Sequence, residues 1–327
     1  MSELYALEVL EKAIEDTKKL FKPFDVKNWF KMIFLMLFVG GGISSFLNVL
    51  SNSFDFLEPF IINNPYTAGT TTIEGFSNGI TGMITHLNPV FGVILSITLL
   101  VFLTWHIISN IMEFVFVKIC EQKNIKILDN FKSNIINGFR LTGFKLIIAA
   151  IIVTIILMTI SIIVPSLEEF EIFLVLLVLG LPIFIVVSLV LMFTRDFVIV
   201  RMVELEKTLT ESLKDVLKMI SEEWKQSIVY IMVKIVLGIA MGIISWIALI
   251  ILLIPIFLIG GVLFLLTYLL YTELVVLSIV LGVISIIFVL VMIGIVIFSI
   301  QVPLMTFERY FSMRVYEKFS GTGFVEN

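Results

Sequence analysis

The sequence predicts an all-α integral membrane protein: six transmembrane helices in three hairpin units, each preceded by a cytoplasmic interfacial amphipathic helix. Of 327 residues, 59% are hydrophobic and 15% are charged, and the mean hydropathy is +1.13. Soluble domains carry about 25% charged residues, so a soluble fold is not expected. The apolar residues gather in runs long enough to cross a bilayer, and the basic residues gather in alternate segments between these runs.

Four apolar runs are clear candidates for spans, because crossing the hydrocarbon core takes about 20 residues of helix. The segment before Met32 is strongly charged and has no evident signal-peptide cleavage site, so we expect the first span to be retained. The four runs are Met32–Leu50, Pro89–Val117, Phe144–Val164 and Ile172–Thr194.

The apolar stretch Ile228–Ile300 predicts two further spans. A single helix over Ile228–Leu266 would be roughly 58 Å long, longer than the membrane is thick. Pro255 and Gly260–Gly261 fall where such a helix would leave the outer face, and proline kinks a helix. We expect span five over Ile228 to about Leu253, span six over Leu274–Ile300, and between them an apolar segment at, or re-entering from, the outer surface. A seventh span is the alternative.

Lysine and arginine predict the orientation. Segments 1–31, 118–145 and 195–227 contain six each and the tail contains three, whereas loops 51–88, 165–171 and 267–273 contain none. By the positive-inside rule both termini are cytoplasmic, and the plasma membrane is the expected location. A seventh span would put the basic tail outside. We expect a single membrane domain with units 1–117, 118–197 and 198–311 and a cytoplasmic tail over 312–327.

The cytoplasmic segments 4–21, 125–140 and 204–221 have the apolar spacing of amphipathic helices. Trp29 and Trp224 each stand 18 residues after the glutamate of a Glu-Lys pair, and Phe144-Lys145 stands at the corresponding place in the middle unit. We interpret the units as three copies of one element. The alternative is that every helix entry at the inner leaflet attracts Trp and Lys.

Two stretches resemble a group of uncharacterised prokaryotic membrane proteins related to the membrane domain beside some glycerophosphodiester phosphodiesterases. In that group a helix of the form S-x-x-x-A-x-x-x-x-W on the inner face leads into each hairpin. This chain lacks a soluble phosphodiesterase domain, so no catalytic residue carries over, and the resemblance implies a membrane module of unknown role. The stretches are Arg195-Asp196-Phe197 through Ser221-Glu222-Glu223-Trp224, and Ile14 through Pro23-Phe24-Asp25 and Trp29 to Gly40-Gly41-Gly42.

Signatures of catalysis are absent from the sequence. It contains no G-x-x-x-x-G-K-[ST], H-E-x-x-H, C-x-x-C or dinucleotide fingerprint. Cys120 is the single cysteine, which rules out an internal disulfide and a cysteine zinc cluster, and His86 and His106 are the only histidines. We therefore expect no enzymatic activity, no metal, no cofactor and no nucleic-acid partner.

Four polar residues inside the expected spans form a candidate cluster. His106, Asn110 and Glu113 stand at i, i+4 and i+7 on span two, and Lys234 lies on span five. Polar groups in hydrocarbon are expensive, so each needs a reason. Two interpretations stay open: a satisfied polar contact that fixes helix packing, or a proton or ion pathway or a headgroup pocket.

Counted from the inner ends of their spans, Glu113 lies about 6 Å deep and Lys234 about 9 Å deep. Because the depths nearly match, we expect the two to form an ion pair. Lys145 is a rival partner for Glu113, and Lys234 could instead extend to the inner headgroups.

Glycines predict close helix packing at two places. Gly238 and Gly242 form a G-x-x-x-G pair on span five, and Gly40, Gly41 and Gly42 lie within span one. Small residues at such spacing let two helix backbones approach.

We expect a transporter or channel-like permease for an ion, a small solute or a lipid. The alternative is a non-transporting membrane scaffold or assembly factor that acts through its inner-leaflet amphipathic helices. A continuous polar path across the bundle would favour the first, and a dry core with an exposed apolar groove would favour the second. Expected partners are membrane lipids and either a second copy or another membrane protein.

Cysteine labelling tests the orientation. Single cysteines at Ser77 and Glu169 should react with an impermeant maleimide in intact cells, whereas one at Ser212 should react only after permeabilisation. The reason is that lysine and arginine are absent from loops 51–88 and 165–171 and abundant in segment 195–227. Labelling at Ser212 from outside would overturn the orientation.

Overall fold

The computed structural model describes residues 5–39, 89–163, 169–271 and 274–323. Within these ranges the chain is all-helical, with no strand. The helices in order are α1 (Tyr5–Glu8), α2 (Leu10–Leu20), α3 (Val26–Met36), α7 (Pro89–Gln122), α8 (Ile127–Ser133), α9 (Ile135–Ile163), α10 (Glu169–Phe193), the π-helix η4 (Thr194–Val198), α11 (Ile199–Leu205), α12 (Leu209–Glu222), α13 (Trp224–Tyr271) and α14 (Val275–Ser320).

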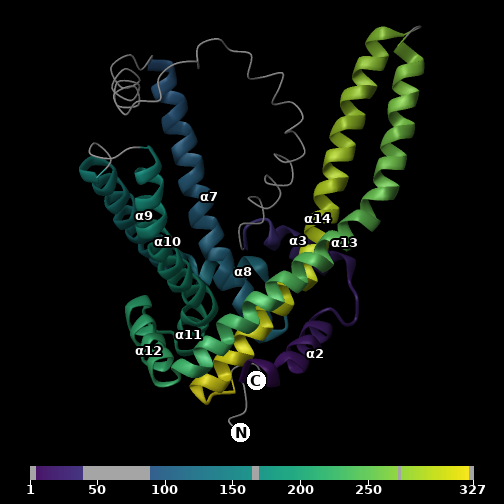
Figure 1. Ribbon diagram of the computed structural model, residues 1–327. Helices are drawn as coiled ribbons and strands as arrows, with labels where there is room; N and C mark the ends of the chain where they lie inside the picture. Colours follow the sequence, from purple (N-terminus) through teal and green to yellow (C-terminus); the bar gives the residue numbers. More distant parts are fainter. Residues whose placement is uncertain (1–4, 40–88, 164–168, 272–273, 324–327) are drawn as a thin grey trace.

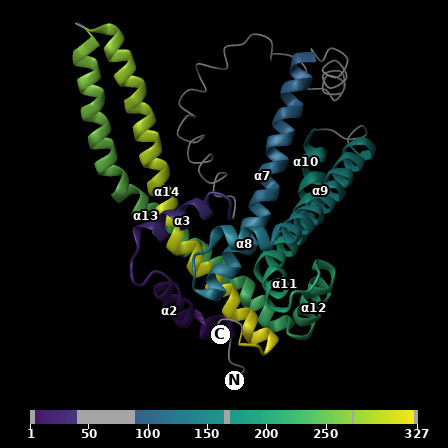
Figure 2. The ribbon, with the colours of Figure 1, turned by 180° about the vertical axis from the view of Figure 1, so that it is seen from behind.

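The helices form a shared base from which two arms diverge (Figures 1 and 2). The base contains α1, α2, α8, α11, α12 and the ends of the long helices that meet them, and both termini lie there. The first arm is formed by α7, α9 and α10. The second arm is the hairpin of α13 and α14, and both of its helices bend on leaving the base (Figure 1).

Five helices in the described part are long and apolar enough to cross a membrane, which indicates a multi-pass membrane protein. The expected first span, Met32–Leu50, begins in α3, but its part from residue 40 onward lies outside the described residues, so the count of six stays a prediction. The five are Ser96–Gln122, Ile135–Thr159, Gly180–Leu205, Trp224–Tyr271 and Val275–Ser320.

The prediction of a helix break near Pro255 is wrong. Helix α13 continues through Pro255 and Gly260–Gly261 to Tyr271, so the expected end of the helix near Leu253 does not occur. Proline removes one intrahelical hydrogen bond, but in an apolar medium the rest of the backbone has no water to bond with and stays helical. The result is an uninterrupted hairpin of two helices with 48 and 46 residues.

The buried core lies in the base rather than in the arms. The end of α14 lies at its centre, where Tyr310, Phe311, Met313 and Tyr316 are fully buried. The expected boundary between residues 311 and 312 therefore falls inside α14, and the first residues of the expected tail belong to the core. Core partners come from four other elements: Met32, Leu35 and Met36 of α3, Phe114 to Val117 of α7, and Phe197 to Val200 of η4 and α11.

Ion pairs join the two ends of the chain in the base. Arg314 of α14 donates from Nε and Nη2 to Oδ2 of Asp16 on α2, at 2.8 and 2.7 Å. Lys318 of α14 lies 2.7 Å from Oε1 of Glu8 on α1. The Arg314 pair is buried, so it holds α2 firmly against α14.

Helices lie in all three segments that were expected to be amphipathic and interfacial. The segments correspond to α1 and α2, to α8 with the start of α9, and to α11 with α12. Their membrane contact and their origin as copies stay predictions. Ser212, the proposed inside labelling position, is fully buried on α12, so the exposed Thr210 replaces it; Ser77 lies outside the described residues.

Close helix approaches occur at other glycines than the expected ones. A Cβ built at Gly238 or Gly242 would meet no atom within 4 Å, so neither mediates packing within the described part of this chain. A Cβ at Gly138 of α9 would lie 2.9 Å from Ile111 Cα of α7, which only glycine allows. The G-x-x-x-G spacing marks a small-residue face, but it does not say whether a helix lies opposite. Gly40, Gly41 and Gly42 lie outside the described residues.

Disulfide cross-linking tests the uninterrupted hairpin. A Cβ at Gly282 of α14 would lie 3.2 Å from Cγ2 of Thr267 on α13, so side chains at these two positions are in contact. In a Cys120→Ala background, Thr267→Cys with Gly282→Cys should oxidise to an intramolecular disulfide that blocks alkylation. Gly261→Cys with Gly282→Cys is the control, because a Cβ at Gly261 meets no atom within 4 Å. An unlinked first pair would restore the break near Pro255.

Candidate functional site

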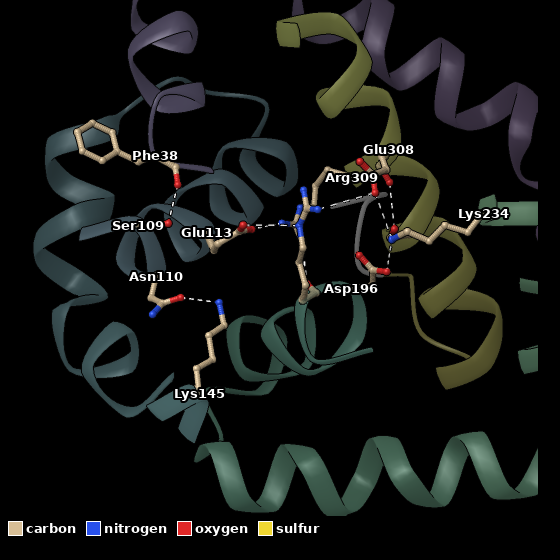
Figure 3. Close-up of polar contacts among 11 residues, drawn as sticks. Phe38, Ser109, Asn110, Glu113, Lys145, Asp196, Lys234, Glu308 and Arg309 are labelled. Carbon is tan, nitrogen blue, oxygen red and sulfur yellow. Dashed lines mark hydrogen bonds and ion pairs between the residues drawn. The ribbon is translucent and has the colours of Figure 1, made fainter. Parts of the chain in front are cut away.

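A network of six charged side chains lies where the two arms meet the base (Figure 3). Its members come from α7, η4, α13 and α14, so it joins both arms. Three carboxylates and three cations sum to zero charge, and paired, neutral sets are the form in which buried charges are tolerated. The members are Glu113, Asp196, Glu308, Arg195, Lys234 and Arg309.

The most deeply buried link is the ion pair between Glu113 of α7 and Arg309 of α14, whose side chains are 6% and 2% exposed. Arg309 also donates from Nη1 to the carbonyl oxygen of Arg195 at 2.7 Å. Its guanidinium lies over the ring of Phe116, 5.4 Å from the centroid. A planar, permanently charged group with five donors can make these contacts together, whereas lysine could not. Arg309 thus holds α7, α14 and η4 in one arrangement.

Arg195 and Asp196 are consecutive, yet they serve opposite sides of the network. Both lie in η4, a turn of π-helix at the end of α10. Arg195 faces Glu113, with Nε 3.6 Å from Oε1, and Glu308, with Nη1 3.9 Å from Oε1. Asp196 instead forms an ion pair with Lys234. π-Helical turns are rare and frequent at functional sites, and this one directs two neighbouring charges toward different arms.

Lys234 anchors the network on α13. Besides its ion pair with Asp196, its Nζ lies 3.3 Å from Oε1 of Glu308. Tyr230, one helical turn earlier, donates its hydroxyl to Oδ2 of Asp196 at 2.8 Å, and the same hydroxyl lies 3.0 Å from Oγ of Ser312. Tyr230 is fully buried, so its hydroxyl depends on these partners.

A second polar group lies beside the network, between α7 and α9. Asn110 donates to Oγ1 of Thr142 at 2.8 Å and accepts from Nζ of Lys145 at 2.6 Å. Its neighbour Ser109 donates to the carbonyl oxygen of Phe38 at 2.6 Å, which ties the N-terminal segment to α7. Figure 3 shows this group on the side of Glu113 away from Lys234.

The structure brings together three of the four expected residues. Glu113 and Lys234 belong to the charge network, and the buried Asn110 lies in the second polar group beside it. His106 is half-buried and stacks on Phe102, with ring centroids 6.3 Å apart, and has no hydrogen bond or ion pair within the described ranges. The expected face therefore continues from Glu113 to Asn110 but ends before His106.

The prediction of an ion pair between Glu113 and Lys234 is wrong, because each is paired with other residues. Glu113 is paired with Arg309 and Arg195, and Lys234 with Asp196 and Glu308. The matched depth was informative, since both residues belong to one network. Depth alone did not identify partners among several opposite charges at one level.

Glu308 and Arg309 are the functional residues that sequence reasoning missed. From the sequence, Arg309 is one of the three basic residues of the tail and Arg195 is one of the six of segment 195–227, and neither is assigned a partner. A usable signal was present: Arg195-Asp196 and Glu308-Arg309 are adjacent opposite charges, in reversed order, at the ends of two apolar runs expected to reach the same side.

The network is suited to locking helices together. Each of its carboxylates lies within 4.0 Å of a cation. Within the described ranges, no group of three or more His, Cys, Asp or Glu side chains could hold a metal ion. The opposite charges pair with one another and so link the two arms, although the buried Nε of Arg195 makes no hydrogen bond within the described residues and only faces Glu113 at 3.6 Å.

Double-mutant cycles test the pairing. Glu113→Gln and Arg309→Gln, alone and combined, should couple by about 1–3 kcal/mol in thermal unfolding in detergent, because contacting pairs couple at that level. Glu113→Gln with Lys234→Gln should couple less, since Arg195 and Glu308 stand between them. The exposed Lys218–Glu222 pair, 3.8 Å apart, is the control and should be additive within about 0.5 kcal/mol. Stronger coupling to Lys234 than to Arg309 would refute this arrangement.

Comparison with known proteins gives one match, to a family model. No curated protein and no solved structure matches the chain. The match shows no link to glycerophosphodiester phosphodiesterases. The matching model, described as a family of unknown function (DUF7544), covers residues 4–322 and so includes the base, both arms and the whole charge network. The chain therefore belongs to the DUF7544 family.

Proposed function

We propose that the protein is a non-transporting membrane scaffold that acts through helices lying at the inner leaflet of the plasma membrane, with both termini cytoplasmic. The observation that carries this proposal is that the charge network lies at one end of long stretches of helix without charged residues. The sequence has no Asp, Glu, Lys or Arg in residues 89–112, 146–163, 172–194, 235–271 and 275–307. Conduction of an ion needs polar groups along the path, and these stretches supply none that are charged.

Exposed apolar side chains on the base helices support contact with the leaflet or with a partner. Ile14 of α2 is 45% exposed, Leu128 of α8 is 75% exposed and Leu217 of α12 is 62% exposed. Lysines lie on the same helices, as at Lys18, Lys132 and Lys218. Exposed apolar side chains beside lysines are typical of helices that lie in the membrane interface.

A permease is the second candidate, favoured by the pair of Asn110 and Lys145. Lys145 is a cation on α9 that lies beside the network, on the side of the first arm. In that case Glu113 would exchange partners between Arg309 and Lys145 during transport. The motif resemblance to the membrane domain of glycerophosphodiester phosphodiesterases belongs with either candidate and assigns no residue a role.

Flux and photo-cross-linking together test the scaffold. Proteoliposomes should show ion and proton flux equal to that of protein-free vesicles, because the network is closed. A photo-reactive amino acid at Ile14 or Leu128 should capture the same protein, identified by mass spectrometry, in native membranes. The same group at Ile243 of α13, which is 56% exposed, is the control and should capture lipid.

Two outcomes would refute the scaffold. Flux above that of empty vesicles that falls in Glu113→Gln would favour the permease. Capture of lipid alone from both Ile14 and Leu128 would leave the base helices without a protein partner.

A further inference from the structure

Lys145 of α9 carries a positive charge that the described part of the chain does not balance. The charge network beside it is neutral by itself, with three carboxylates and three cations. The ammonium of Lys145 donates to Oδ1 of Asn110 at 2.6 Å (Figure 3), and no carboxylate of the described residues lies within 4.0 Å of it. An amide oxygen accepts a hydrogen bond, but it brings no negative charge.

The carboxylate nearest to hand is already engaged. Three charged side chains are close enough to influence Lys145, namely Glu113, Arg195 and Arg309. Glu113 is paired with both arginines, so none of its charge is left over for the lysine. Lys145 is also half-buried, and a cation withdrawn from water is costly unless an anion accompanies it. An anion from outside the chain would remove this cost.

Lys145 lies where the packed face of α9 becomes exposed. Toward the base, Gly138 lies against α7 and Thr142 is 3% exposed. Ala149 lies one turn beyond Lys145 on the same face of α9, and it is exposed. The ammonium is therefore held at the edge of the contact between α7 and α9, where a ligand can reach it from outside.

His106 provides a second donor at this edge. It lies one helical turn from Asn110 on α7 and is half-buried, and the charge of Lys145 acts on its imidazole. Its ring N–H has no hydrogen-bond acceptor among the described residues. Phosphate oxygens accept well from an ammonium and from an imidazole N–H, and the bond to an ammonium is strengthened by its charge.

The position along α9 indicates which anion is at hand. Lys145 is the last charged residue before the charge-free stretch 146–163, so it lies where α9 enters its apolar run. Lysines at such an entry lie at the level of the lipid headgroups. The next residues, Leu146 and Ile147, are 45% and 62% exposed and suit contact with acyl chains. A zwitterionic lipid brings its own cation, so an anionic lipid balances Lys145 better.

We propose that Lys145 and His106 bind the phosphate of an anionic phospholipid at the edge between α7 and α9. Asn110 holds the ammonium in position through its amide oxygen, and the phosphate supplies the negative charge that Lys145 lacks. The acyl chains lie along the exposed apolar side chains of the first arm. This site is independent of the scaffold function, since its argument is charge balance and a permease could carry the same lipid.

Native mass spectrometry tests the site. Protein in mild detergent with equal amounts of phosphatidylglycerol and phosphatidylcholine should retain phosphatidylglycerol about fivefold over phosphatidylcholine as its first lipid, the ratio expected from one lysine near an anionic group. Lys145→Gln should abolish this preference, whereas Lys145→Arg should keep it, because the charge remains. Lys225→Gln is the control, because it removes an exposed lysine at the start of the second arm and should leave the preference unchanged.

Thermal unfolding separates lipid binding from a structural role of Lys145. In lipid-free detergent Lys145→Gln should leave the Tm unchanged or raise it, since it removes an unbalanced charge. Phosphatidylglycerol should raise the Tm of the unmodified protein and of Lys145→Arg but not that of Lys145→Gln, and inorganic phosphate should raise none of them.

Four results would each overturn the proposal. The first is equal retention of the two lipids by the unmodified protein, and the second is an unchanged preference in Lys145→Gln. The third is a lower Tm of Lys145→Gln without lipid, which would mean that the chain itself balances the charge. The fourth is stabilisation by inorganic phosphate equal to that by phosphatidylglycerol, which would make the ligand a free anion.

Discussion

The ion pair of Glu113 with Arg309 is the contact on which the arrangement of the arms depends. It joins α7 to α14 where both leave the base, and Arg309 also holds η4 through the Arg195 carbonyl. Breaking a buried pair by removing one partner costs about 3–5 kcal/mol, because a charge is left alone. Any conformation that parts α7 from α14 has to provide new partners for both side chains. The described lengths beyond this vertex are held by apolar contacts and by a few neutral hydrogen bonds, such as that from Ser278 of α14 to the carbonyl oxygen of Thr267 on α13.

Closure of the network bears directly on the choice between scaffold and permease. A conducting site exchanges partners as its ion or proton enters and leaves. Here Glu113, Asp196 and Glu308 are each shared between two basic or hydroxyl partners, which resists such exchange. Charge-balanced buried pairs are weak evidence for stability, but they favour one arrangement over others. A fixed arrangement is useful to a protein that presents surfaces to partners.

The apolar runs predicted the all-helical fold and its long apolar helices, because the bilayer strongly constrains both. The orientation expected from the clustering of lysine stays a prediction. Pairing within the site was not predictable, since six charged residues at similar depth allow many combinations. Glu308 and Arg309 were missed because a hydropathy pattern ends a span where charges begin, whereas α14 continues as a helix to Ser320. The break at Pro255 failed for a related reason: in lipid the backbone stays helical even where one hydrogen bond is lost. Gly238 and Gly242 show that a face of small residues mediates packing only where another helix lies opposite it.

The lengths of α13 and α14 indicate how deep in the membrane the network lies. The charge-free part of α13, residues 235–271, is about 55 Å long, and that of α14, residues 275–307, is about 50 Å. Both exceed the hydrocarbon thickness of about 30 Å, and ordinary tilts of up to about 40° do not absorb the difference. Both helices bend as they leave the base, so their lower parts run obliquely to their upper parts (Figure 1). An oblique segment adds helix length but little depth, which accounts for the length in excess of the hydrocarbon thickness. If the arms span the hydrocarbon, the oblique parts and the network lie at the interface, not at the bilayer centre. A charge is far less costly there, which explains how six of them persist in so apolar a chain.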